Sequence, residues 1–204
     1  MVSELEALEW WQRALNDAQV MGDSVLLYSI DHTDRGTDDY GPRYVPKGAE
    51  IGFSRHVAEP LGHDKDCRRL ETAVGRVFVR LDESVPVVAA QMRHELEHFL
   101  QVEAIGDFGG WYEEIKGRIQ SAGLREQEGK LYNLIPAEVD ANRAASRFAR
   151  CWFGEAIPEL SQGAHGVLFW HSDDPGPLSS LMDRMAEFDD SLDAHIGDRR
   201  SAGN

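Results

Sequence analysis

The chain has 204 residues, with 36 acidic and 21 basic side chains and a net charge of −15. This length suits one domain spanning residues 1–204, and the apolar content of 42% is enough for a core. An acidic surface repels phosphate backbones and anionic lipid headgroups, which argues against nucleic acid and membranes as partners.

The predicted elements begin with a helix over residues 3–20 and a buried strand over residues 24–30. A loop is expected over residues 31–47 and a second strand over residues 52–57. Residues 76–82 alternate as a strand with one face on the core. The core face would carry Val77, Val79 and Leu81, and the other face Arg76, Phe78, Arg80 and Asp82.

The second half of the chain is predicted to be mainly helical. A helix over residues 87–104 follows Ser84, which can cap it. A loop over residues 106–110 separates it from a helix over residues 111–124, and a further helix is expected over residues 137–153.

An irregular stretch over residues 163–177 precedes the last predicted helix. One apolar stripe marks that helix: Leu178, Leu181, Met182, Met185, Phe188 and Leu192. The order of elements predicts an α+β fold. Its core would span about residues 24–153, and a helical C-terminal part about residues 154–198.

Two cysteines, Cys67 and Cys151, are too few for a disulfide framework, and their spacing leaves a single bridge open. Residues 1–19 are interrupted by acidic side chains and lack the basic start and apolar run of a secretory signal. No segment reaches the roughly 18 uncharged apolar residues needed to span a bilayer. We therefore expect a cytoplasmic protein.

The helix over residues 87–104 contains the motif His94-Glu95-Leu96-Glu97-His98. Residues four apart lie one turn apart on a helix, so the two imidazoles can bind one cation. Glu95 would point aside from the metal, where a base acting on a metal-activated water must stand. The motif predicts a Zn2+ site with Glu95 as the catalytic residue. Two surface histidines on a helix are the alternative interpretation.

A catalytic zinc ion needs a third protein ligand, and Glu138 is the best candidate. It shares one helical stripe with small or apolar residues: Ala141, Ala145, Phe148, Ala149 and Trp152. A carboxylate on such a face is unfavourable to bury unless a cation compensates it. The alternative is an acidic residue that favours the helix dipole. Asp140 lines up instead with three arginines and is expected on a solvated face.

Three further polar residues lie near these positions. Asn142, four residues after Glu138, could hydrogen-bond a ligand, or could simply stand at the edge of the stripe. Gln101 and Glu97 are more easily interpreted as solvated positions.

The HELEH helix, preceded by a strand and followed about forty residues later by a helix bearing Glu138, resembles the gluzincin branch of zinc metallopeptidases. The run over residues 138–142 (EVDAN) also resembles the glutamate helix of ImmA/IrrE-like peptidases, which usually have Gly where Glu97 stands. The resemblance implies a zincin-like fold, with a small twisted sheet packed on the active-site helix. It also implies zinc ligation by His94, His98 and Glu138.

The expected activity is hydrolysis of peptide bonds in a peptide or protein substrate, with Glu95 as general base and then general acid. A further donor should stabilise the oxyanion. The sequence leaves four candidates open: Tyr112, Tyr132, His165 and His171.

Two alternatives accompany this hypothesis. The first is a zinc-stabilised peptide-binding or regulatory module without turnover, whose site would be closed by a fourth protein ligand. The second places a metal at a loosely spaced cluster that is more simply a polar loop: His56, His63, Asp64, Asp66 and Cys67.

Overall fold

The computed structural model describes residues 1–22, 24–30, 43–46, 58–62, 74–105, 107–121 and 135–154, together with 185, 186 and 190. In chain order its elements are α1 (Glu4–Ala18), β1 (Val25–Ile30), β2 (Arg43–Pro46), β3 (Ala58–Pro60), β4 (Gly75–Val79), α3 (Val85–Ala104), α4 (Phe108–Ser121) and α6 (Pro136–Phe153). The chain therefore has the expected α+β fold. The strand predicted over residues 52–57 and most of the last predicted helix lie outside the described residues.

The strands form one mixed sheet in the order β2-β4-β1-β3. The central strands β1 and β4 are parallel, and each outer strand is antiparallel to its neighbour. Val77 and Phe78 of β4 point to opposite faces, yet both are fully buried. The expectation that Phe78 lies on an uncovered face is therefore wrong. Its ring packs against Tyr28 of β1, with 5.0 Å between centroids.

Strand β2 falls inside the segment that was expected to be a loop. Its register pairs Tyr44 with Val77 and Pro46 with Gly75. Proline cannot donate to a strand ladder and is tolerated at a sheet edge, and β2 is an outer strand among those that the structure describes. The pairing with β4 defines this strand, because its four residues carry no strand pattern of their own.

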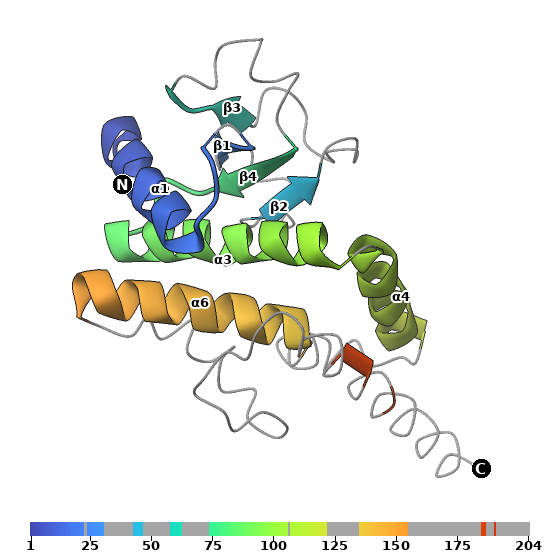
Figure 1. Ribbon diagram of the computed structural model, residues 1–204. Helices are drawn as coiled ribbons and strands as arrows, with labels where there is room; N and C mark the ends of the chain where they lie inside the picture. Colours follow the sequence, from blue (N-terminus) through green and yellow to red (C-terminus); the bar gives the residue numbers. More distant parts are fainter. Residues whose placement is uncertain are drawn as a thin grey trace.

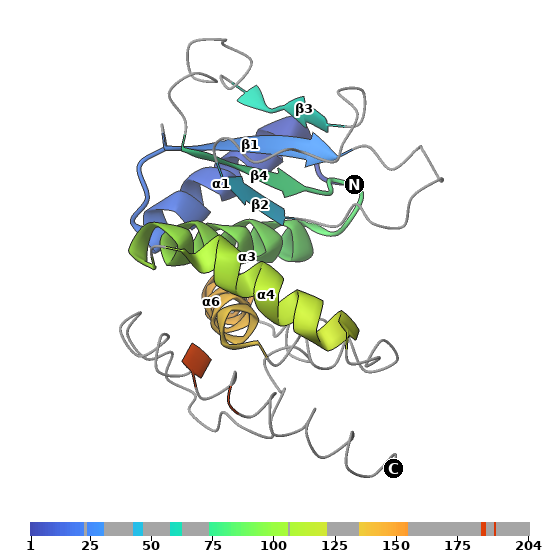
Figure 2. The same cartoon turned by 90° about the vertical axis from the view of Figure 1, so that its right-hand side faces the viewer.

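Helix α3 lies between the sheet and α6 (Figure 1 and Figure 2). One stripe of its side chains is buried against α1, β1 and β4: Val88, Met92, Leu96 and Phe99. On the other side, Ala90 packs against Ala145 and Ala149 of α6. At the opposite end of α3, Gln101 contacts Ala137, so the two helices run antiparallel. This packing places the first turn of α6 beside the C-terminal half of α3.

The helix ends follow local capping chemistry. Ser3 and Glu6 form a reciprocal capping box at the start of α1. Helix α6 has Pro136 in its first turn and ends at Gly154, whose φ of 71° suits glycine. Helix α4 begins at Phe108, inside the predicted 106–110 loop, because the Asp107 side chain accepts a hydrogen bond from the Gly110 N–H at 3.2 Å.

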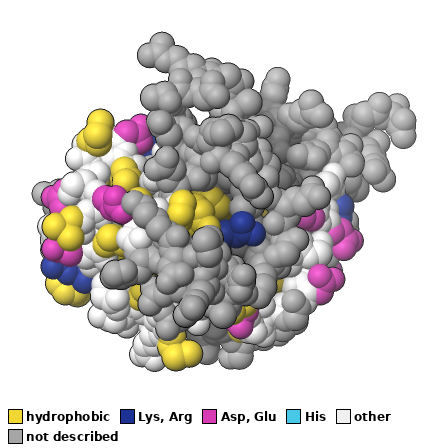
Figure 3. Space-filling model, turned by 90° about the horizontal axis from the view of Figure 1, so that it is seen from above, with side chains coloured by type: hydrophobic (Ala, Val, Ile, Leu, Met, Phe, Trp, Pro, Cys, Tyr) yellow, Lys and Arg dark blue, Asp and Glu magenta, His cyan; other side chains and the backbone are white. Residues whose placement is uncertain are grey.

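The described surface is polar with scattered apolar side chains. Trp152, which the stripe on α6 placed in the core, is exposed and packs edge-on against Trp10. Among the side chains that are coloured by type in Figure 3, the acidic ones appear in several separate places. Among the described helices, none has both the length and the apolar character needed to cross a membrane.

Arg93, directly before the histidine motif, ties α3 to α1. Its side chain is 6% exposed and donates to Asp17 at 2.6 Å and to Glu97 at 2.8 Å. We expect Arg93→Met to lower the free energy of unfolding by about 1–3 kcal/mol, because both carboxylates lose their charged donor. Urea denaturation would measure this change.

Arg80→Met is the matched control. Arg80 pairs with Asp82, but its side chain is 29% exposed, so its loss should lower stability by less than about 1 kcal/mol. Equal destabilisation by the two variants would contradict a special role for the buried Arg93 network.

Candidate metal centre

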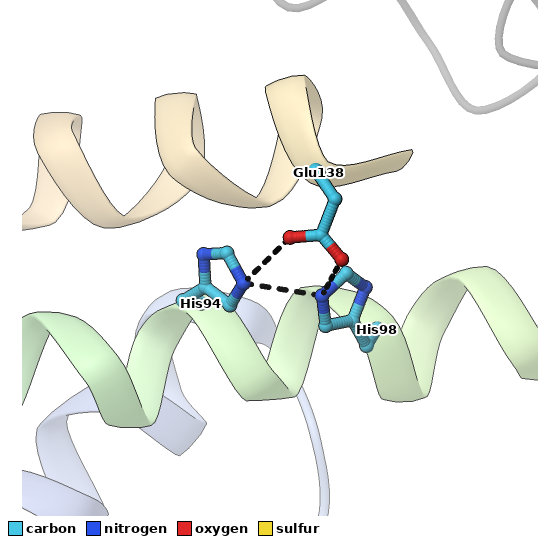
Figure 4. A group of neighbouring side chains, drawn as sticks. All are labelled: His94, His98 and Glu138. Carbon is cyan, nitrogen blue, oxygen red and sulfur yellow. Dashed lines mark hydrogen bonds and ion pairs between the residues drawn. The ribbon is translucent and has the colours of Figure 1, made fainter. Parts of the chain in front are cut away.

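Three side chains from two helices converge at one point (Figure 4). His94 and His98 project from successive turns of α3, and Glu138 projects from the first turn of α6. The two Nε2 atoms lie 3.1 Å apart. Glu138 places Oε2 3.4 Å from His94 Nε2 and Oε1 3.4 Å from His98 Nε2. The structure thus brings together the three residues that the sequence proposed as ligands.

The three side chains are close enough together to hold one metal ion. With bonds of about 2.0–2.1 Å, two ligand atoms of a tetrahedral site lie about 3.3 Å apart. The two Nε2 atoms lie 3.1 Å apart, and each lies 3.4 Å from a different oxygen of Glu138. With one ligand atom taken from each residue, the three atoms lie within 4.8 Å of one another. In the part of the chain that the structure describes, these three residues are the group that could hold a metal ion. Three ligands leave a fourth coordination position for a water or substrate.

The triad is largely removed from solvent. The histidine side chains are each 13% exposed and that of Glu138 is 6% exposed. Ala141 and Ala145, on the same stripe as Glu138, are fully buried, as the helical wheel predicted. A carboxylate buried among small apolar residues needs a positive partner. Here the two imidazoles occupy that position.

The pKa values of His98 and Glu138 are coupled. Burial opposes the charged imidazole, but the nearby Glu138 carboxylate outweighs it and raises the pKa of His98 to about 9. Burial also opposes the charged carboxylate, and the imidazoles outweigh it and hold the pKa of Glu138 well below its ordinary value. Without metal, these opposite shifts favour a protonated His98 beside an ionised Glu138.

Metal affinity should consequently increase with pH between pH 7 and 9. His98 must lose its proton before Nε2 can bind a metal, and its pKa of about 9 means that protons compete throughout this range. We expect the apparent affinity for zinc to rise about tenfold per pH unit and to level off above pH 9. Competition titrations against a chelator would measure this affinity at each pH, once the known pH dependence of the chelator has been subtracted. A flat profile would contradict proton competition at His98.

Glu95 lies beside the triad and is buried. Burial raises the pKa of its carboxyl group, the imidazoles of His94 and His98 lower it, and Glu138 raises it, with a net upward shift. The backbone N–H of Tyr44 hydrogen-bonds the Glu95 carboxylate. The edge strand β2, which the sequence did not predict, thus contacts the residue that the sequence proposed as the base.

Tyr112 of α4 also reaches the site. Its hydroxyl donates to Glu138 Oε1 at 2.5 Å. Of the four candidate oxyanion donors, Tyr112 is the one that lies among the described residues. Tyr132, His165 and His171 lie outside them, as do all five residues of the alternative cluster: His56, His63, Asp64, Asp66 and Cys67.

Two polar residues that the sequence placed in solvent are buried. Gln101 is 0% exposed, and its Oε1 lies 2.8 Å from His98 Nδ1. Asp140 and Asn142 are buried as well, as is every residue from 136 to 142 at the start of α6.

Glu97 is only slightly exposed and pairs with Arg93. Cys151 is an exposed free thiol, and Cys67 lies outside the described residues.

Comparisons of the chain with protein-family models, curated proteins and solved structures found no match. The function must therefore be inferred from the chemistry of the residues themselves.

Proposed function

We propose that the protein is a zinc-dependent peptidase of the HExxH gluzincin type, with a zincin-like core similar to that of ImmA/IrrE-like peptidases. One observation carries this proposal: the imidazoles of His94 and His98 meet the carboxylate of Glu138 within 3.4 Å. The mixed sheet packed on α3 supports the proposed fold, since a zincin core needs a sheet on its active-site helix.

Zinc is the metal that suits this set of ligands. Two imidazole nitrogens and one carboxylate oxygen, with a fourth position open, are typical of catalytic zinc sites. The ion would supply Lewis acidity, which makes a water molecule more acidic and a peptide carbonyl more electrophilic.

Glu95 is the proposed proton carrier. Its carboxylate accepts a proton from the attacking water and delivers that proton to the leaving nitrogen of the cleaved peptide. A raised pKa suits a group that must accept and donate within one cycle near neutral pH. Its burial beside the triad keeps it close to the reacting atoms without making it a ligand.

Strand β2 is the proposed docking edge for the substrate. It is an outer strand of the described sheet, and its Tyr44 N–H contacts Glu95. An extended peptide that pairs with a sheet edge is held by backbone hydrogen bonds, and its scissile bond can be presented beside the edge.

The test is metal content together with peptide hydrolysis. The purified protein, loaded with zinc and freed of excess, should contain about one zinc per chain and cleave members of a fluorogenic peptide library. Dialysis against a chelator should remove both properties, and added zinc should restore both. Failure to bind zinc stoichiometrically would refute the metal centre.

The rival function is a zinc-stabilised peptide-binding or regulatory module. The burial of Glu95 and its hydrogen bond with Tyr44 favour it, because a base held in this way is less free to meet water. This rival predicts that chelation lowers the melting temperature while no peptide of the library is cleaved before or after zinc is restored.

A further inference from the structure

Gln101 has both ends of its side-chain amide hydrogen-bonded. Its Nε2 donates to the backbone carbonyl of Ala137 at 3.0 Å, and its Oε1 lies 2.8 Å from His98 Nδ1. The side chain is fully buried between α3 and α6. A buried polar group with two such contacts constrains both of its partners.

The two contacts together fix the position of a proton. A backbone carbonyl can only accept, so the amide end that faces Ala137 must be the NH2 group. The carbonyl end then faces His98, and Nδ1 must carry the hydrogen that it donates. In the neutral imidazole this leaves the lone pair on Nε2, the atom that faces His94 and Glu138.

The same side chain also links the two elements that supply the ligands. Ala137 directly precedes Glu138 in the first turn of α6, and His98 lies three residues before Gln101 on α3. The Gln101 amide therefore connects His98, one proposed ligand, to Ala137, the residue next to the proposed ligand Glu138.

We propose that Gln101 is a positioning residue of the metal centre: it selects the His98 tautomer that presents Nε2 and fastens the first turn of α6, and with it Glu138, to α3. This inference rests on the metal centre of the proposed function. Residues that orient a metal-bound histidine in this way typically change metal affinity by 10–100-fold when they are replaced.

The test compares Gln101→Met with Gln101→Glu. Methionine fills a similar volume but can neither accept from Nδ1 nor donate to Ala137, so zinc affinity should fall by about 10–100-fold. A carboxyl group can still accept from Nδ1, so Gln101→Glu should bind zinc more tightly than Gln101→Met. Leu61→Ala, a core change directly after β3, at the end of the sheet opposite β2, is the control for general destabilisation and should leave zinc affinity within about twofold.

A second measurement does not depend on any variant. In 15N-labelled, zinc-loaded protein, nitrogen shifts should place the His98 proton on Nδ1, with slow exchange as expected for a buried hydrogen bond. Unchanged zinc affinity in Gln101→Met, or a proton on Nε2 in the wild type, would overturn the inference while leaving the metal centre intact. A wild-type chain that binds no zinc would overturn both proposals.

Discussion

Glu95→Gln is expected to reduce peptide hydrolysis by about 10²–10⁴-fold while the protein still binds one zinc ion. Glutamine keeps the shape of the side chain and can still accept a hydrogen bond from the Tyr44 N–H, but its amide cannot take up a proton from water. Because Glu95 is not one of the three proposed ligands, zinc content should not change. The measurements are kcat with a cleaved peptide and the zinc-to-protein ratio.

Glu97→Gln is the matched control for this variant. It makes the same substitution two residues away on α3, at a side chain that pairs with Arg93. Activity should stay within a few-fold of the wild type, with a modest loss of stability from the broken ion pair. Substantial turnover by Glu95→Gln would remove Glu95 from the mechanism and favour another base.

The cluster of His94, His98 and Glu138 could be predicted from sequence because its geometry is mostly local. Two histidines four residues apart are neighbours on any helix. To place His94 beside His98 it was therefore enough to predict that this segment is a helix. Glu138 required one further step. A carboxylate on a stripe of small and apolar residues is unfavourable to bury unless a cation compensates it, which indicated a ligand. The structure places the Glu138 carboxylate against both imidazoles, as expected.

Gln101 and Asp140 were misplaced because burial of a polar residue depends on tertiary packing. The helical wheel assigns one buried face to each helix. Helix α3, however, packs on the sheet with one side and on α6 with another, so Gln101 is enclosed between two elements. The only local signal was its spacing of three residues from His98, which allows a side-chain contact on a helix.

Strand β2 shows a second limit of sequence patterns. The segment RYVP is short and contains a proline, so no alternation distinguishes it from the surrounding loop. Its strand conformation follows from pairing with β4, a contact between segments about thirty residues apart in the chain. The contact between Tyr44 and Glu95 depends on that pairing and could not be anticipated.

Glu138→Ala should weaken zinc binding by more than about 100-fold, beyond the usual effect of losing a partner that only orients a ligand. Wild-type protein at a free zinc concentration 100 times the dissociation constant gains about 2.7 kcal/mol of stability, and the variant should gain little of it. Thermal denaturation with and without zinc measures this difference. Glu103→Ala, at an exposed position on α3, is the control and should respond to zinc as the wild type does.

The metal-free wild type and the metal-free Glu138→Ala variant give a second test. Their difference in stability should change with pH in the direction opposite to zinc stabilisation. Pairing with Glu138 raises the pKa of His98 from 6.5 to about 9, so its contribution to stability is full below pH 6.5 and is lost as the pH rises to 9. Glu138→Ala removes this contribution, and its deficit relative to the wild type should therefore shrink between pH 6.5 and 9. Zinc stabilisation of the wild type should grow over the same range, because fewer protons compete.

If the Glu138→Ala variant bound zinc like the wild type, Glu138 would not be a ligand, and only the histidine pair on α3 would be left to support a metal centre.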